Sequence, residues 1–137
     1  MQKQELLKGL NIISCKEGGN KIINLLQWAN NLANDNKVLF ISWEYSLAML
    51  QQYFIELGEH KNINLDTYTE FEYLDASSFV AIFDMIEDGS YSLVFLEGIS
   101  RSHKNHFCDN HYPQGYAVNN SLTFLANKLD IILILIN

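Results

Sequence analysis

The sequence contains a single proline, two cysteines and one arginine among 137 residues. So little proline, together with 48% hydrophobic and 12% aromatic residues, argues against a disordered tail and for a chain that folds around a core. Cys15 and Cys108 are too few for a disulfide framework, which favours a reducing compartment. Arg101 is the only arginine, and 16 acidic residues against 9 basic ones give a net charge of −7. That balance argues against broad nucleic-acid binding, which needs many cations to neutralise phosphates.

Long hydrophobic runs are also missing. The longest, residues 131–136, is far too short to span a bilayer. Residues 1–5 do not have the form of a signal peptide. We therefore expect a cytoplasmic protein without a membrane partner. The length fits one domain over residues 1–137.

Continuous apolar stretches alternate with patterns of helical period along the chain. Strands are expected at residues 10–14, 37–42, 62–67, 91–96 and 131–136. Helices are expected at residues 20–34, 45–57, 79–88 and 116–129, with Ser77 or Ser78 capping the third helix. A polar loop, residues 98–115, precedes the last helix. This alternation predicts an α/β fold of three layers, a parallel sheet with helices on both faces.

The segment between the first strand and the first helix has part of a phosphate-binding pattern. That pattern reads G-x-x-x-x-G-K-[ST]. Lys21 stands at the lysine position, but Cys15 and Asn20 replace the two glycines and Ile22 replaces the hydroxyl residue. The segment therefore keeps the charge of a nucleotide site and loses a metal ligand.

Four segments occur in the order of a known family. They are residues 9–13 leading to Lys21, residues 38–46 with the sequence VLFISWEYS, residues 92–97 with the sequence SLVFLE, and residues 121–129 with the strand that follows. Together they resemble the RecA-like ATPase core of replicative helicases of the DnaB type, over almost the whole chain. The resemblance implies a RecA-like, P-loop NTPase-like fold.

The resemblance also implies roles for six residues. Gly18, Gly19, Asn20 and Lys21 would bind the phosphates of a nucleotide. Glu44 would polarise the attacking water, and Glu97 would stand in the Walker B position, where the family has aspartate. An alternative for Glu44 is a capping acid at a helix start. Because Ile22 and Glu97 both weaken the metal site, we expect no bound cofactor, with weak ATP and Mg²⁺ binding as the alternative.

Two polar segments have competing interpretations. His103, His106, Cys108 and His111 are zinc or copper ligand types, although their spacing matches no standard finger and loops collect histidines by chance. Arg101 and Lys104 make the same 98–115 loop locally basic, which fits weak contact with nucleic acid. Residues 66–75 mix acids with aromatics, either as a partner-binding edge or as a loop whose aromatics pack on the sheet.

Three functions compete. The favoured hypothesis is a degenerate RecA-like pseudoenzyme, a binding or regulatory protein linked to DNA replication or recombination. Its partner would be another RecA-like ATPase or a replication complex, with oligomerisation open. The second is a small ATP-binding protein or ATPase that uses Lys21, Glu44 and Glu97. The third is a domain of flavodoxin-like strand order that binds another small anion, which strand order would distinguish.

Overall fold

The computed structural model describes residues 6–14, 21–58, 60–99 and 114–136. Strands and helices alternate along them in the predicted order. The strands are β1 (Gly9–Ile13), β2 (Val38–Ser42), β3 (Leu65–Tyr68), β4 (Leu93–Glu97) and β5 (Ile132–Ile136). The helices are α1 (Lys21–Leu32), α2 (Leu47–Glu56), α3 (Ala76–Gly89) and α4 (Gln114–Leu129). The bounds differ from the sequence expectation by a few residues at the ends.

The five strands run parallel in the order β1-β5-β4-β2-β3. Hence β1 forms one edge of the sheet and β3 the other. A flavodoxin-like order places the first strand inside the sheet, so that alternative is wrong for this chain. β2 and β4 are buried at every position, as their uninterrupted apolar sequences predict for inner parallel strands.

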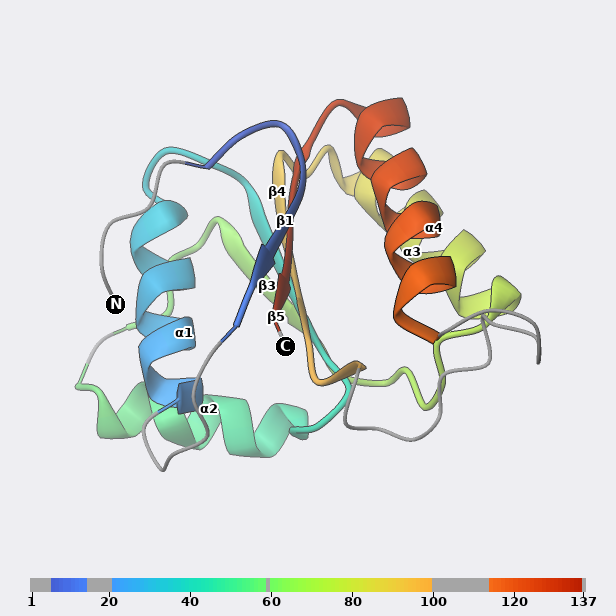
Figure 1. Ribbon diagram of the computed structural model, residues 1–137. Helices are drawn as coiled ribbons and strands as arrows, with labels where there is room; N and C mark the ends of the chain where they lie inside the picture. Colours follow the sequence, from blue (N-terminus) through green and yellow to red (C-terminus); the bar gives the residue numbers. More distant parts are fainter. Residues whose placement is uncertain (1–5, 15–20, 59, 100–113, 137) are drawn as a thin grey trace.

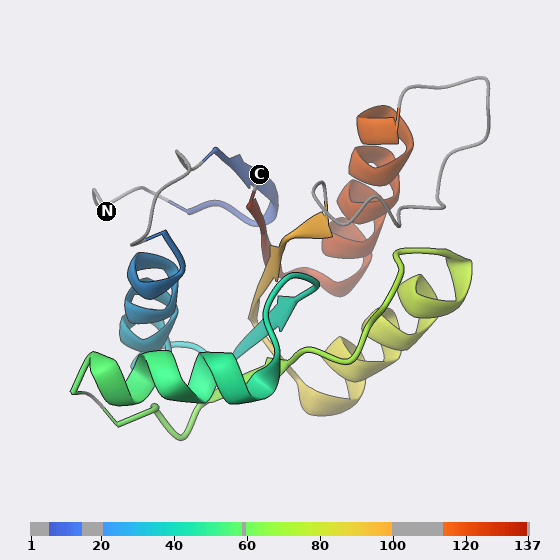
Figure 2. The same ribbon diagram turned by 90° about the horizontal axis from the view of Figure 1, so that it is seen from below.

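The helices cover the sheet on both faces. The chain runs from β1 toward β3 and then returns through β4 and β5. Parallel crossovers are right-handed, so a reversal of direction moves the connecting helix to the other face. As a result α1 and α2 lie on one face and α3 and α4 on the other, as Figures 1 and 2 show. The expected three-layer α/β architecture is confirmed.

Each face has its own hydrophobic core. One core joins α1 and α2 to the sheet through buried residues that include Leu25, Leu26 and Phe54. The other joins α3 and α4 to the opposite face through residues that include Ile82 and Leu125. Among the described residues, no helix combines the length and the apolarity needed to cross a bilayer.

The start of α3 differs from the sequence expectation. Asp75, and not Ser77 or Ser78, is the capping residue. The Asp75 carboxylate accepts from the Ser78 N–H at 2.8 Å, and the Asp75 N–H donates to the Ser78 hydroxyl at 2.8 Å. Because this capping box satisfies two helix-start donors at once, the serine serves as its inner partner and the helix begins earlier than expected.

The aromatics of residues 66–75 lie mostly against the sheet. Phe71 stacks on Trp43 with ring centroids 5.7 Å apart and contacts Tyr68 at 4.8 Å. Leu74 is buried in the same core. The packed-loop interpretation therefore describes these side chains, and a partner-binding role for the segment stays a prediction.

Candidate functional site

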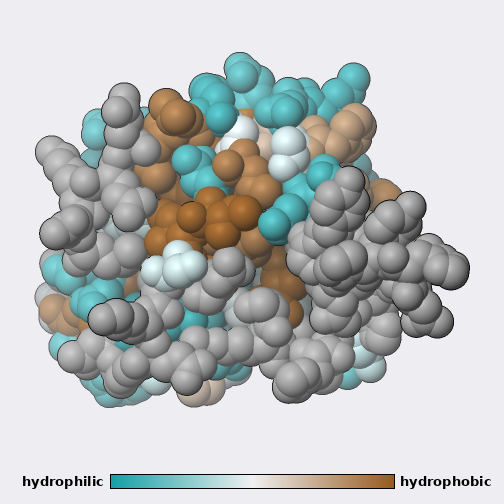
Figure 3. Space-filling view, in the orientation of Figure 1, coloured by the Kyte–Doolittle hydropathy of each residue, from teal (hydrophilic) through white to brown (hydrophobic). Residues whose placement is uncertain are grey.

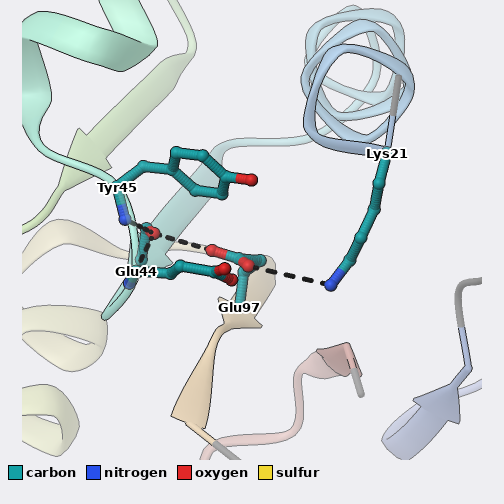
Figure 4. Close-up of polar contacts among 5 residues, drawn as sticks. Lys21, Glu44, Tyr45 and Glu97 are labelled. Atoms are coloured by element: carbon teal, nitrogen blue, oxygen red, sulfur yellow. Dashed lines mark hydrogen bonds and ion pairs between the residues drawn. The ribbon is translucent and has the colours of Figure 1, made fainter. Parts of the chain in front are cut away.

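Lys21 and Glu97 meet at the carboxyl edge of the sheet (Figure 4), and Ser42 hydrogen-bonds to Glu97 there. Lys21 is the first residue of α1, Ser42 the last of β2 and Glu97 the last of β4. The register of the sheet places Ser42 directly beside Glu97. The connection after β4 leaves toward the opposite face from those after β1 and β2. Open α/β sheets bind ligands where connections diverge in this way.

The carboxyl group of Glu97 is completely buried. Its Oε2 accepts a hydrogen bond from Ser42 Oγ at 2.7 Å. Its Oε1 lies 4.0 Å from Lys21 Nζ, and the two side chains are 0% and 6% exposed. Among the described residues, no donor hydrogen-bonds to Oε1. A buried charge with so few partners is poorly compensated.

The pKa of Glu97 is raised from 4.5 to about 7. Burial is the largest cause, because it disfavours the charged form. The Ser42 hydrogen bond lowers the pKa, Glu44 raises it through hydrogen bonding and charge, and Lys21 lowers it. Glu97 therefore holds a proton in a large share of molecules at neutral pH.

Ser42 fixes the turn that carries Glu44. Its hydroxyl accepts from the backbone N–H groups of Glu44 at 3.2 Å and Tyr45 at 2.9 Å, while it donates to Glu97. The Glu44 side chain extends beside Glu97 in Figure 4. Gly98 closes the other side: its φ is +90°, and a Cβ there would lie 2.9 Å from Glu44 Cβ and 3.0 Å from Glu44 N. Only glycine fits both the angle and the space.

Ile22 occupies the hydroxyl position of the phosphate-binding pattern. It is 2% exposed and packs into the core beneath α1 with Leu25 and Leu26. An isoleucine side chain offers no oxygen to a metal ion. Within the described ranges, no three His, Cys, Asp or Glu side chains gather as a metal site. The described site therefore offers an amine and two carboxyl groups, and position 22 adds no hydroxyl to them.

Several predicted site residues lie outside the described part of the chain. They are Cys15, Gly18, Gly19 and Asn20 of the loop, and Arg101, His103, Lys104, His106, Cys108 and His111 of the 98–115 segment. Their roles stay predictions. The structure does bring Lys21, Glu44 and Glu97 together, although these residues are far apart in the sequence.

Two residues that shape the site were not singled out from the sequence. Ser42 connects the Glu44 turn to Glu97, and Gly98 makes room for that turn. Two signals in the sequence were available. Ser42 is a hydroxyl residue at the end of an apolar strand, and Gly98 directly follows the acid that ends another strand. Neither signal is specific, because the contact depends on β2 and β4 being neighbours.

Comparison with known proteins identifies the fold. No protein-family model and no curated protein matches the chain. Among solved structures, the flagellar accessory protein FlaH from Methanocaldococcus jannaschii is similar, with a TM-score of 0.65 and 13% sequence identity. The fold is RecA-like. The match covers 96% of this chain and 62% of the FlaH chain, so this RecA-like chain spans less than two thirds of that protein.

At 13% identity, the likeness to FlaH concerns the fold alone. The arrangement of strands and helices nevertheless determines where the residues of the site lie. It places Lys21 at the helix that follows the first strand and Glu97 at the end of an inner strand two positions away. The acid and the amine can meet because only β5 separates those strands.

Proposed function

We propose that the chain is a degenerate RecA-like domain that acts by binding a protein partner and does not hydrolyse nucleotide. The burial of Ile22 is the observation that carries this proposal. Its side chain is 2% exposed and belongs to the core, so the position that should supply a hydroxyl to Mg²⁺ serves packing. Phosphoryl transfer depends on such metal contacts to neutralise developing charge.

The Lys21–Glu97 contact supports the same proposal. Lys21 lies on the buried carboxyl group of Glu97 at 4.0 Å. To reach a phosphate, the lysine would have to leave that partner and expose a buried acid to an anionic ligand. Separating the amine from the buried carboxyl group is unfavourable in the molecules in which Glu97 is ionised, because it leaves a buried charge without its partner. Nucleotide binding through Lys21 would have to overcome this cost.

The DnaB-type resemblance supplies the class of partner. We infer that the domain works in DNA replication or recombination and docks on another RecA-like ATPase or on a replication complex. The net charge of −7 fits a protein partner better than direct binding along DNA. The cytoplasm is the compartment that this role requires.

The convergence of three groups favours a second candidate, a small ATP-binding protein or ATPase. Lys21 and Glu97 lie in one buried contact, and Glu44 is close enough to raise the Glu97 pKa. In this candidate Lys21 contacts phosphate, Glu44 activates water and Glu97 anchors a metal-bound water. Gly18, Gly19 and Asn20 would complete the phosphate contacts.

Calorimetric titration with Mg²⁺-ATP separates the two candidates. We expect no binding heat at millimolar nucleotide, and no increase in the unfolding temperature, because a ligand that binds only the folded state must stabilise it. Binding that is lost in Lys21→Ala but kept in Lys61→Ala would overturn the proposal in favour of the second candidate. Lys61 is an exposed lysine away from the site and serves as the matched control.

Partner binding needs its own measurement. The purified chain, immobilised and exposed to a host extract, should retain a RecA-like ATPase or a replication protein identified by mass spectrometry. The interaction should then be reproduced with the two purified proteins. Failure to retain such a protein, with folded bait confirmed by circular dichroism, would contradict the binding role independently of the nucleotide result.

A further inference from the structure

The two edges of the sheet differ in how they are protected. Natural sheets usually protect an edge with charged residues, proline, short strands or a covering element. β3 has four residues, and its Asp66 accepts a hydrogen bond from the Tyr91 hydroxyl. β1 is longer, and its sequence GLNII contains neither a charged residue nor a proline. The β1 edge therefore lacks the usual sequence features that oppose pairing with another strand.

The outer side of β1 carries backbone groups that pair with no other described strand. Gly9 pairs with Ile132, and its N–H donates to the Ile131 carbonyl at 2.8 Å. In a parallel ladder, alternate residues bond to the same neighbour, so Gly9, Asn11 and Ile13 face β5. The N–H and C=O groups of Leu10 and Ile12 consequently point away from the sheet. Among the residues described, no strand lies on that outer side.

Apolar side chains accompany these backbone groups. Ile12 is 48% exposed, and Leu7, just before the strand, is 64% exposed. Figure 3 shows hydrophobic residues gathered in the middle of the face where Figure 1 places β1 in front. Exposed apolar surface beside free backbone groups is typical of a strand-addition site.

The charge distribution indicates which partner fits. Beside the strand, Lys8 lies 3.6 Å from Asp130, and the two charges cancel. Most of the other exposed acids among the described residues lie on α2, on α3 and on the segment leading into α3: Glu56, Glu70, Glu72, Asp84, Glu87 and Asp88. Asp35, after α1, and Glu44, after β2, are exposed as well. Two identical acidic chains would repel each other least at an edge whose described residues carry no net charge.

We propose that β1 pairs antiparallel with β1 of a second copy of this chain, about a two-fold axis at Asn11. In this register Leu10 of each copy faces Ile12 of the other, and their outward groups form four backbone hydrogen bonds. The two sheets become one continuous sheet. A contact limited to one strand is smaller than a standard interface of roughly 1,600 Å², so we expect a reversible dimer with a Kd of about micromolar. This inference does not depend on whether Lys21 binds nucleotide.

Sedimentation velocity over a concentration series tests the pairing. Wild type should shift from monomer to dimer between low and high micromolar concentration. Ile12→Lys should raise the Kd at least about tenfold, because it puts two like charges at the two-fold contact. Ile55→Lys should leave the dimer intact, since Ile55 is 71% exposed on α2, away from β1. A wild type that stays monomeric throughout, or a dimer that responds to Ile55→Lys and not to Ile12→Lys, overturns the proposal.

A backbone variant and amide exchange locate the contact. Ile12→Pro removes an N–H that points outward, so it should weaken the dimer and leave the bonds between β1 and β5 in place. In wild type, exchange at the Leu10 and Ile12 amides should slow about tenfold as the dimer forms, while Asn11 and Ile13 are protected at every concentration. Protection of Leu10 and Ile12 in the monomer would show that another segment of the same chain covers the edge, and would overturn the proposal.

Discussion

Lys21 and Ile22 are neighbours at the start of α1, and their side chains enter different environments. Lys21 reaches the buried carboxyl group of Glu97, whereas Ile22 packs into the core with 2% of its surface exposed. A serine or threonine at position 22 could bind Mg²⁺ only if its hydroxyl pointed toward Lys21 and Glu97 and away from the core. The buried isoleucine contributes burial of apolar surface, which is worth about 1.5–3 kcal/mol for a side chain of this size, and it offers no oxygen to a metal ion.

The fit between Gly98 and Glu44 gives a prediction for a single methyl group. Gly98→Ala should lower the free energy of unfolding by about 2–4 kcal/mol, because the new Cβ would meet Glu44 at 2.9 Å and the φ of +90° is unfavourable for alanine. Urea unfolding followed by circular dichroism measures the change.

Gly58→Ala is the matched control for that substitution. Gly58 also has a positive φ, +70°, but no atom lies within 4 Å of the position that a methyl group would take there. Its cost should stay near the conformational penalty of about 1 kcal/mol. Equal losses in the two variants would show that backbone angle alone, and not the Glu44 contact, requires glycine at position 98.

At the scale of elements, the first residues of α2 and α3 show which side chains cap a helix and where the helix begins. Ser46 caps α2 by accepting from the Met49 N–H at 3.2 Å, and Glu44, the capping acid considered from the sequence, lies two residues before this cap. At α3, a serine was expected to cap and an aspartate does so. The reciprocal bonds of Asp75 and Ser78 satisfy more donors than either serine could alone.

The capping box predicts unequal effects of neighbouring substitutions. Asp75→Ala should destabilise the protein by about 1 kcal/mol, because the Ser78 N–H loses its acceptor. Ser77→Ala should change stability by less than about 0.5 kcal/mol, since Ser77 is exposed within the first turn. Thermal unfolding of the two variants provides the comparison, and a larger loss for Ser77→Ala would mean that the serine is the cap.

At the scale of the whole molecule, the sheet separates the two hydrophobic cores and brings the residues of the site together at its carboxyl edge. β2 and β4 bury every residue, and their carboxyl ends bring Ser42 against Glu97. The sheet therefore contributes to both cores and also buries the Glu97 carboxyl group, where water cannot solvate its charge. The stability of the entire fold should consequently depend on the protonation of Glu97.

That dependence gives a prediction with a definite sign. The pKa of Glu97 is about 7 in the folded protein against 4.5 ordinarily, so between these values the folded state holds a proton that the unfolded chain releases. Stability should therefore fall as pH rises through this window. Wild type should lose about 2–3 kcal/mol relative to Glu97→Gln between about pH 5 and pH 8, measured by urea unfolding.

Glu56→Gln is the control for the pH series, because Glu56 is an exposed acid at the end of α2. This variant should keep the wild-type slope of stability against pH. If the curves of wild type and Glu97→Gln run parallel over the whole range, the buried carboxyl group does not titrate in that window, and the role assigned to its burial is wrong.

The sequence by itself determined the elements, because hydrophobic period and turn residues are local signals. It predicted the parallel three-layer architecture, and the resemblance in residues 38–46 and 92–97 pointed to Glu44 and Glu97 as neighbours of Lys21. Only the tertiary structure decided the strand order, since several orders satisfy the same alternation of strands and helices. Strand order in turn set the Ser42–Glu97 bond, the fit of Gly98 and the burial that raises the Glu97 pKa. Those properties arise from contacts between residues far apart in the chain, which local patterns do not encode.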